Sequence, residues 1–397
     1  MPAPASPSTA RAINDRLALR LLQQEGPLTA GQLKQLTGLS RPTVADLVER
    51  LAAAGLIAVV GESGEQRRGP NARLYGIVAD RAYLAALDVR TESVSVVVSD
   101  LLGAELARAS VPIADDAGTG PAVEQAVALV ERAAKEAGAE RLHTVGIGAP
   151  GLIDPATGEL RDSSGLPQWH RRLVAALQER LPARVIVENE TNLAALAEQR
   201  DGAARDRDTF VLLWLGHGTG AAVVLDGSLR RGASGGTGEI GFLPVPGTTT
   251  LPSATDCEGG FHSLAGAAAI ARLAMEHGLT AEPTAHEPRA AALVRDAVAG
   301  ADGAPAARFL DALADRVAIG AASVVAVLDP GCVVLGGEVG QAGGDVLAAR
   351  VEQRLARMSP LPAEVRASAL GGDAVLRGAL LTAREGAQDE LFAPPQR

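Results

Sequence analysis

The sequence predicts two structural parts, an N-terminal helix-turn-helix domain and a larger α/β body built from a duplicated unit. Residues 28–51 read as two short helices joined by a tight turn. Residues 210–229 repeat the pattern of residues 84–103, in which an apolar strand, a polar turn, a second strand and an Asp-containing turn follow one another. With 397 residues, of which 47% are hydrophobic, the chain is long enough for two or three domains with sizeable cores.

The first helix of the motif begins with a capping-box pattern. Thr29 is followed three residues later by Gln32, and Leu33 and Leu36 are expected to form the apolar face. Gly38 then marks the end of a helix of about two turns. This spacing predicts a short first helix and a tight turn after it.

The second helix is expected to follow Ser40, a preferred N-cap residue, with Pro42 in the first turn, where a missing N–H is tolerated. Four apolar positions at helical spacing should face inward: Val44, Leu47, Val48 and Leu51. The N-terminal end of a recognition helix is the end that meets base edges in a major groove. We therefore predict a DNA-contacting face made of Ser40, Arg41, Pro42, Thr43 and Asp46.

The segments on either side of the motif favour a winged helix. A preceding helix that completes a three-helix core is indicated by an apolar stripe of Ile13, Leu17 and Leu21. Two strands expected at 56–60 and 73–78 enclose a polar tip that carries Arg67 and Arg68, a pair suited to a minor groove or to phosphates. Because this fold does not by itself imply DNA binding, a winged helix used for protein contacts is the alternative.

The net charge of −10 is unevenly distributed. The first 80 residues carry +2 and the remainder −12, so any contact with DNA should come from the N-terminal domain. Two cysteines give no disulfide framework, and no apolar run approaches the about 18 residues of a membrane span. Since residues 1–10 lack the features of a signal peptide, we expect a cytoplasmic protein with no membrane partner and with disordered ends at 1–10 and 387–397.

The body should contain two lobes after a DNA-binding domain at 11–80. In the first lobe, at 81–205, three antiparallel strands at 84–88, 93–99 and 105–112 precede a helix at 121–138, a strand at 144–148, a helix at 171–181 and a strand at 185–188. The pattern restarts at Phe210. The second lobe, at 206–386, should add helices at 263–277, 306–328, 345–358 and 374–385, a strand at 332–335 and a turn at 336–340. A cleft between lobes is a common ligand site.

Several motifs resemble those of the ROK family, which includes bacterial sugar kinases and transcriptional repressors. They are the winged helix, GAPG at 148–151, ENETNLAALAE at 188–198, LGHGTGAAVVLDGSLRRGASGGTGEIG at 215–241 and DPGCVVLGG at 329–337. The resemblance extends from 11 to 384 and implies an actin-like, ribonuclease-H-like body. Kinases of the family lack the N-terminal winged helix, so the resemblance implies the transcriptional-regulator branch.

The resemblance also identifies two turns that would hold nucleotide phosphates in a kinase. The first needs an Asp-x-Gly-Gly-Thr sequence, because glycine lets the backbone close on the phosphates, but residues 88–92 read Asp-Val-Arg-Thr-Glu. Both glycines are missing, and Glu92 adds negative charge. The second turn, 216–220, keeps three glycines, which we attribute to the needs of a tight hairpin. We expect no cofactor.

Family resemblance places the catalytic base at the Asp of an Asn-Asp pair, where this chain has Asn189 and Glu190. The extra methylene moves the carboxylate by roughly 1 Å, and such misplacement can cost about 100-fold in rate. We expect no catalysis, although Glu190 could still hydrogen-bond a hydroxyl. The alternative is that both residues only cap the following helix and complement its dipole.

The family's remaining sugar contacts map onto Glu239 and onto His262, which stands in place of a glutamate, while Phe242 replaces a histidine. Loop 151–169 is expected to line the same cleft through Ser163 or Ser164, with Trp169 packing. The predicted effector site consists of Gly151, Ser163, Asn189, Glu190, Glu239 and His262.

The family's zinc site needs three cysteines and the histidine that is missing here. Only Cys257 is present in the corresponding segment, and Cys332 lies in an apolar strand, so we expect no metal. The leading hypothesis is a non-enzymatic repressor that binds operator DNA as a dimer or tetramer and responds to a sugar or sugar-like effector. One alternative is an ATP-dependent sugar kinase with a vestigial DNA module. The other is a dimeric regulator without an effector.

Overall fold

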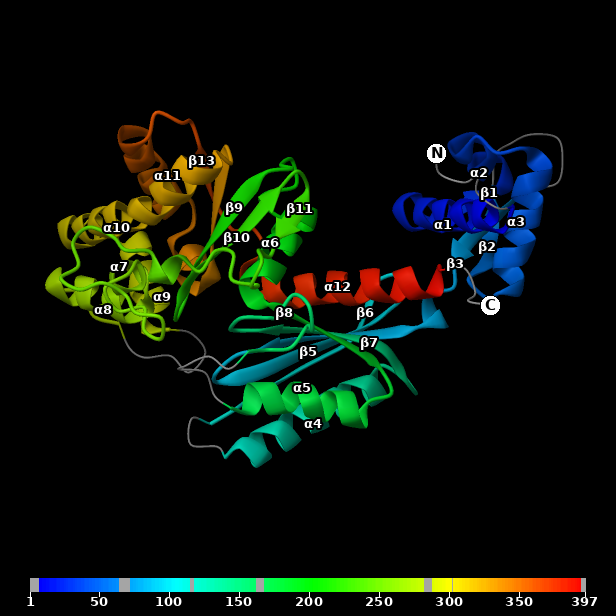
Figure 1. The fold of residues 1–397 in the computed structure, drawn as a ribbon, viewed down its shortest axis with the longest axis horizontal. Coiled ribbons are helices and arrows are strands. Elements are labelled where there is room, and N and C mark those ends of the chain that lie inside the picture. The colour runs from blue at the N-terminus through cyan, green and yellow to red at the C-terminus, as the bar shows by residue number, and fades with distance from the viewer. Residues whose placement is uncertain are drawn as a thin grey trace.

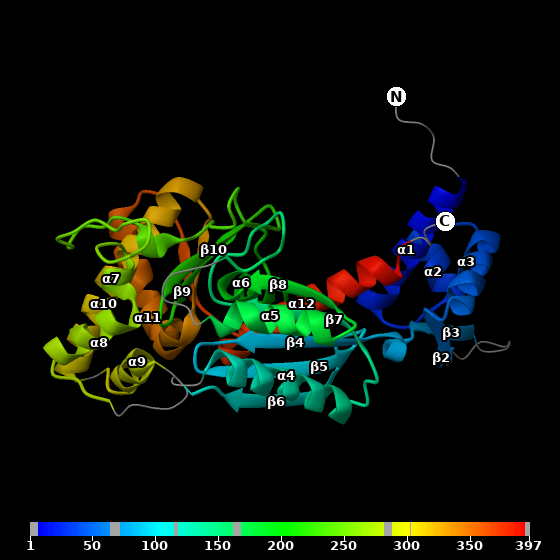
Figure 2. The ribbon, with the colours of Figure 1, turned by 60° about the horizontal axis from the view of Figure 1, so that its bottom comes forward.

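The computed structural model describes residues 7–63, 72–114, 118–161, 168–281, 288–301 and 303–393. A winged helix is followed by two lobes, each built on a five-stranded sheet. Figures 1 and 2 both place the winged helix at one end of the molecule, beside the first lobe and away from the second. Within the described ranges, no helix combines the length and the apolar character needed to cross a membrane.

The winged helix forms as its local sequence signals predict. Thr29 Oγ1 accepts a hydrogen bond from the Gln32 amide at 3.2 Å, and Gln32 Oε1 accepts one from the Thr29 amide at 2.9 Å, which completes the capping box. Gly38 ends the first helix of the motif with a left-handed φ of 70°. The elements are α1 (Pro7–Glu25), β1 (Leu28–Thr29), α2 (Ala30–Thr37), α3 (Arg41–Ala53), β2 (Ile57–Ser63) and β3 (Ala72–Ile77).

The expected inward faces of α1 and α2 are wrong in part. Ile13 and Leu17 are 59% and 40% exposed, and Leu36 is 50% exposed. The residues of α1 that enter the core are Ala18, Leu19 and Leu22. These residues share one hydrophobic cluster with residues of α2, α3 and the C-terminal helix, and Arg16 of α1 pairs with Asp389 of that helix.

The two lobes confirm the predicted duplication. The first sheet has the strand order β6-β5-β4-β7-β8, and the second has the order β11-β10-β9-β12-β13. In each sheet the first three strands along the chain pair antiparallel with one another. The last two strands along the chain run parallel to the first one, which is β4 in the first sheet and β9 in the second. The first lobe contains β4 (Tyr83–Val89), β5 (Ser93–Asp100), β6 (Glu105–Pro112), α4 (Thr119–Glu136), β7 (Leu142–Ala149), α5 (Trp169–Arg180), β8 (Arg184–Asn189) and α6 (Glu190–Asp201), after the short turn η1 (Ala79–Arg81).

The second lobe differs from expectation in its helices. The expected helix at 263–277 is broken at Gly266, α9 was not predicted, and the expected turn at 336–340 is already helical, with a kink at Gly344 instead. The elements are β9 (Phe210–Leu215), β10 (Thr219–Leu225), β11 (Ser228–Arg230), η2 (Ile240–Phe242), α7 (His262–Ala265), α8 (Ala267–Glu276), α9 (Arg289–Ala299), α10 (Ala304–Leu328), β12 (Cys332–Gly336), α11 (Gly337–Met358) and β13 (Glu364–Ala367).

The C-terminal helix returns to the first lobe. After η3 (Gly371–Asp373), α12 (Ala374–Leu391) lies on the face of the first sheet opposite α4 and α5, and it runs on to the winged helix (Figures 1 and 2). The boundary at 386 and the disordered tail from 387 were therefore wrong for the described part, because Ala387, Gln388 and Phe392 are buried. Likewise, α1 begins at Pro7, within the segment 1–10 that was expected to be disordered.

Helices α6 and α12 fill the space between the two sheets. One hydrophobic cluster joins residues of both sheets to these helices, including Val97 of the first lobe and Trp214 of the second. At the other end of α12, Ala383, Ala387 and Phe392 share a core with Leu19 and other residues of the winged helix, and Arg16 pairs with Asp389. A single helix thus contacts the inter-lobe core and the winged helix.

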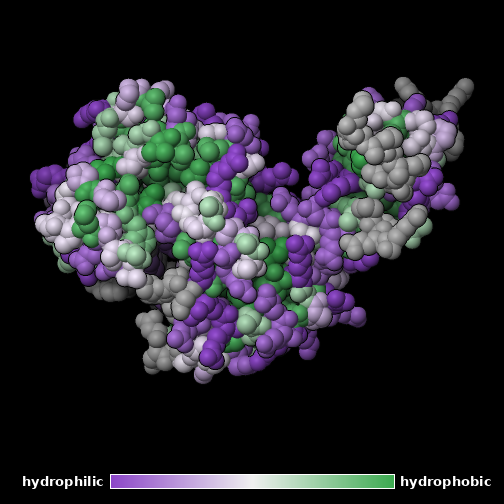
Figure 3. Space-filling view, viewed as in Figure 1, coloured by the Kyte–Doolittle hydropathy of each residue, from purple (hydrophilic) through white to green (hydrophobic). Residues whose placement is uncertain are grey.

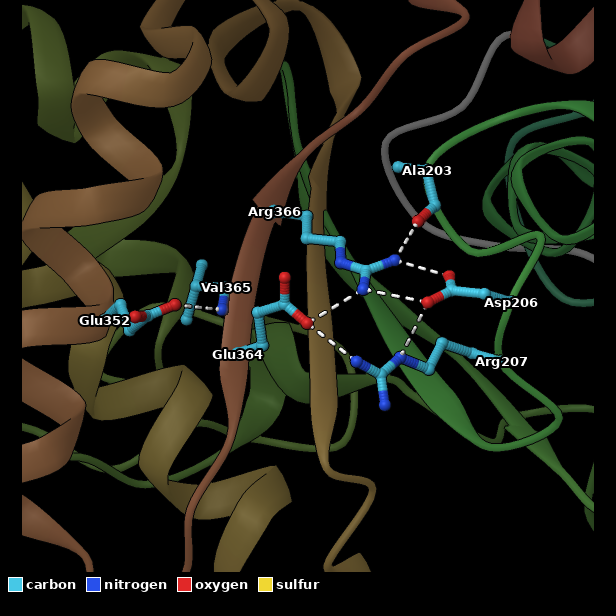
Figure 4. Close-up of polar contacts among 7 residues, drawn as sticks. All are labelled: Ala203, Asp206, Arg207, Glu352, Glu364, Val365 and Arg366. Atoms are coloured by element: carbon cyan, nitrogen blue, oxygen red, sulfur yellow. Dashed lines mark hydrogen bonds and ion pairs between the residues drawn. The ribbon is translucent and has the colours of Figure 1, made fainter.

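The two chain segments that cross between the lobes are tied together at one place. Glu198 of α6 is fully buried, and its carboxylate accepts hydrogen bonds from the amides of Ala203, Ala369 and Leu370. Ala203 belongs to the first crossing and the other two belong to the second. Figure 4 shows Arg366, next to the second crossing, donating to the Ala203 carbonyl and to Asp206, both at 2.6 Å. These hydrogen bonds hold the two crossing segments side by side.

Candidate functional site

The predicted DNA-contacting residues lie at the start of α3. Ser40 caps the helix and accepts a hydrogen bond from the Thr43 amide at 3.3 Å, while the two hydroxyls are 2.8 Å apart. Arg41, Pro42 and Asp46 are exposed, and Thr43 is half-buried. The inward positions Val44, Leu47, Val48 and Leu51 are all buried, as predicted. The helix therefore presents its N-terminal polar face to solvent.

Asp46 has an ion-pair partner on its own helix. It pairs with Arg50, which also donates to Asp15 of α1 at 2.5 Å and so ties the recognition helix to the domain. The wing strands β2 and β3 pair antiparallel with an irregularity between Val59 and Gly61. Arg67 and Arg68, at the predicted tip, lie outside the described residues.

A polar cavity of about 170 Å³ lies between the lobes. It is lined by Gly151 and the β8–α6 junction of the first lobe, and by the β9–β10 hairpin and loop 235–239 of the second. Four of the predicted effector residues line it together: Gly151, Asn189, Glu190 and Glu239. Thr219, Thr237 and Trp214 also line it and were not singled out from the sequence.

Of the two remaining predicted effector residues, one lies outside this cavity and the other is not among the described residues. His262 is half-buried, lies beside Gly266 and is not among the residues that line the cavity. Burial lowers the pKa of its imidazole. Ser163 and Ser164 lie outside the described residues. Trp169 is buried in the first-lobe core, which confirms that it packs, and its ring meets that of His170 edge to face at 4.3 Å.

Asn189 and Glu190 play different parts. The Asn189 side chain accepts from the Thr191 amide at 2.9 Å and donates to the Gly151 carbonyl at 2.9 Å, so it caps α6 and fixes the neighbouring loop. Among the described residues, the Glu190 carboxylate has no hydrogen-bond partner. Burial raises the pKa of Glu190 to about 8, and the charges of Asp88 and Glu338 add to this effect. Asn189 thus caps α6 and also lines the cavity, while the Glu190 carboxyl group in the same lining has no hydrogen-bond partner among the described residues.

The missing glycines of the first turn are replaced by a salt bridge that crosses the cleft. Arg90 donates to Asp88 at 2.9 Å within the first lobe and to Glu338 of α11 at 2.7 Å in the second. Burial raises the pKa of Asp88, an effect that Arg90 opposes. A neighbouring cavity of about 370 Å³ is lined by Asp88, Glu92, Glu338 and Asp373 against Arg90 and Arg108. Four carboxylates around this cavity disfavour a triphosphate.

A second ion pair crosses the cleft beside the smaller cavity. Arg231, which follows β11, donates to Glu188 at 2.6 Å, and the buried Glu188 also accepts from the Asn189 amide and the Asn192 side chain. Sequence reasoning did not assign a role to either residue. Both lie inside the motifs at 188–198 and 215–241, but their sequence separation gave no sign that they meet.

Glycines let the loop after Arg231 approach closely. Gly238 has a φ of 88°, and a Cβ there would lie 1.8 Å from the Ala221 carbonyl oxygen. Gly235 has a φ of 80°, and a Cβ there would lie 2.0 Å from the Ile153 carbonyl oxygen of the first lobe. These two positions require glycine, and they bring Glu239 to the cavity. Over the described residues, no group of three or more His, Cys, Asp or Glu is arranged to hold a metal ion.

Known proteins resemble both parts of the chain. A model of the MarR family matches residues 13–69. A glucokinase of Halalkalibacterium halodurans is 30% identical over 246 residues, which are 59% of this chain and 74% of that protein. The DNA-binding transcriptional dual regulator NagC of Escherichia coli is 27% identical over 241 residues, and the matched segment spans only 57% of its length.

A solved structure shares the fold from the winged helix through both lobes. It is a ROK family transcriptional regulator described as a homologue of the E. coli MLC protein, with a TM-score of 0.76 at 22% identity, and the match covers 96% of this chain and 98% of that one. The model of the ROK family matches residues 84–385, which is well over half of the chain. The chain therefore belongs to the ROK family.

Proposed function

We propose that this protein is a transcriptional repressor whose binding to operator DNA is controlled by a sugar or polyol bound between its lobes. The observation that carries the proposal is the path of α12, which contacts the inter-lobe core at one end and the winged helix at the other. Similarity to NagC and to a xylose repressor of Caldicellulosiruptor bescii, 24% identical over 237 residues, supports it.

The DNA-binding part of the proposal rests on the exposed N-terminal face of α3. Arg41→Ala should relax base specificity, because arginine is the side chain that most often reads guanine in a major groove. Arg67→Ala and Arg68→Ala should instead weaken binding to all sequences and flatten its salt dependence, if the wing reaches phosphates. Fluorescence anisotropy with operator duplexes selected by the full chain measures both effects. Identical sequence preference in wild type and Arg41→Ala would contradict this assignment.

The lining of the smaller cavity indicates the class of effector. It contains carboxyl, amide and hydroxyl groups, and none of its described lining residues is Lys, Arg or His. Segment 162–167, which the structure does not describe, has no basic residue in its sequence either. A phosphorylated sugar would find no basic side chain among these lining residues to bind its phosphate. We therefore propose an uncharged, unphosphorylated effector whose hydroxyls bond to these groups.

Effector binding and DNA binding would be coupled through movement of the lobes. Arg90–Glu338 and Arg231–Glu188 both cross the cleft, so a ligand that changes the cleft must change these contacts. The movement would reach the winged helix through α12. In a homodimer it would alter the spacing of two recognition helices, whose half-sites lie about 34 to 36 Å apart per helical turn. Linkage then requires operator DNA to weaken effector binding by the same factor.

A ligand screen followed by a DNA titration tests this coupling. Neutral sugars and polyols are first screened for a rise in melting temperature of the full chain, since a ligand that binds only the folded state raises it. Operator affinity is then measured with and without each hit. Glu239→Gln should abolish the response and leave operator affinity unchanged, with the exposed Glu131→Gln on α4 as the control. A cleft-binding ligand that leaves operator affinity unchanged would contradict the coupling.

The similarity to a glucokinase favours a sugar kinase as the second candidate function. Two observations argue against a kinase. Arg90 forms a salt bridge at the first phosphate turn, and four carboxylates line the adjoining cavity. We propose that the protein is not an enzyme and expect no transfer of phosphate from ATP to hexoses. Turnover that disappears in Glu190→Gln would establish the kinase instead.

A further inference from the structure

A groove beside α12 collects arginine side chains and shares no lining residue with the effector cavity. Its volume is about 350 Å³, near the lower end of the range for small-molecule sites. Four arginines line it, against the two carboxylates Glu105 and Asp201: Arg108, Arg200, Arg377 and Arg384. These residues come from β6, the end of α6 and two turns of α12. The concentration of positive charge is notable in a chain whose net charge is −10.

Most of this positive charge has no partner. Arg108 is already bound, because it donates to Glu105 and to Asp373 at 2.9 Å. Arg200 and Arg377 are exposed, and neither forms an ion pair or hydrogen bond with any residue that the structure describes. The groove thus retains cationic groups that face solvent and that are not needed for contacts within the fold.

Arg384 is the third arginine of the groove that forms no ion pair with a described residue, and a hydrogen bond to the backbone fixes its position. Arg384 is half-buried and donates to the Leu102 carbonyl at 3.1 Å, while its buried Nε has no partner among the described residues. Burial and, to a smaller extent, the nearby charge of Arg200 lower the pKa of Arg384, while Glu385 and Asp201 act in the opposite direction. Like charges so placed repel one another, and a bound anion would relieve the repulsion.

The remaining walls are apolar. Val97, Leu376, Leu380 and Leu381 complete the lining, so the groove offers a surface for a ring or carbon chain beside its cationic end. Arginine is well suited to phosphate because its planar fork donates two parallel hydrogen bonds. We propose that this groove binds the phosphate group of a small phosphorylated metabolite, as a site separate from the effector cavity.

The location of the groove favours a small molecule over the phosphates of operator DNA. Figure 3 shows a deep notch between the second lobe and the winged helix, with hydrophilic side chains over the neck where α12 crosses. The recognition helix α3 lies at the far end of the molecule in Figures 1 and 2, beyond that neck. A ligand in the groove would contact α12 directly, since Arg377 and Arg384 both belong to it. The site could therefore act on the helix that supports the winged helix.

Calorimetric titration of the full chain tests the proposal. The probes are inorganic phosphate, glucose 6-phosphate and glucose, all at an ionic strength matched with chloride. We expect saturable binding of glucose 6-phosphate that weakens about 10-fold or more in Arg200→Gln and in Arg377→Gln, as for loss of a charge-assisted hydrogen bond. Inorganic phosphate should bind more weakly at the same residues, because it lacks the part that meets the apolar wall. Arg132→Gln, on α4 at the opposite face of the sheet, should bind like wild type.

Arg200→Gln and Arg377→Gln also distinguish a small phosphorylated metabolite from the DNA backbone as the source of the bound phosphate. Both substituted arginines are exposed, so the variants should melt like wild type. Their affinity for operator DNA in the absence of other phosphates should also be unchanged. A fall in operator affinity with a flatter salt dependence would assign the groove to the DNA backbone and overturn the proposal. Absence of saturable binding, or equal affinity in wild type and both groove variants, would overturn it as well.

Discussion

Replacing Glu190 by glutamine should change how the stability of the protein depends on pH. The carboxyl group has a pKa of about 8 in the folded chain, against an ordinary value of 4.5. Between these values the native state keeps a proton that the unfolded state releases. Wild-type stability must therefore fall as the pH rises through this window, by up to about 1.4 kcal/mol per pH unit. Glutamine resembles the protonated carboxyl and cannot ionise.

The expected difference is large enough to measure. From pH 6 to pH 8, Glu190→Gln should gain roughly 2 kcal/mol of unfolding free energy relative to wild type, and the gain should level off above pH 8. Urea denaturation at half-unit steps of pH gives both curves, and the exposed Glu131→Gln on α4 is the matched control, expected to follow wild type. Parallel curves for wild type and Glu190→Gln, or a gain by wild type on raising the pH, would refute the argument.

Three further predictions concern contacts between distant segments. Glu198→Ala should lower the free energy of unfolding by at least about 3 kcal/mol, because the amides of Ala203, Ala369 and Leu370 all lose the buried carboxylate that accepts from them; a loss below 1 kcal/mol in urea denaturation would contradict it. A double-mutant cycle of Arg90→Ala and Glu338→Ala should give a coupling of about 1 to 3 kcal/mol, whereas additive losses would show that the bridge is not formed. Phe392→Ala should cost about 3 kcal/mol and expose the winged helix to limited proteolysis; an unchanged digestion pattern would contradict the shared core.

Local signals in the sequence determined much of the fold. The capping box at Thr29 and the N-cap Ser40 predicted α2 and α3, since a cap depends on hydrogen bonds within about four residues. Alternation of apolar residues predicted the meander, and β6 forms at 105–112 as expected. The repeated pattern at 210–229 predicted the duplicated sheet, which the two matching strand orders confirm. Resemblance to the ROK family, and not local pattern, predicted that Gly151, Asn189, Glu190 and Glu239 meet, and all four line one cavity.

Tertiary contacts decided what these local signals left open. The buried face of α1 includes Leu19 and excludes Ile13, and its core cluster contains Ala383 and Ala387 of α12, far away in the sequence. The periodicity of α12 predicted a helix, but only the fold returned it to the first lobe. Arg90 meets Glu338 although 248 positions separate them along the chain. A side chain's partner depends on which surfaces pack together, and that choice depends on the whole chain and not on the few residues around each group.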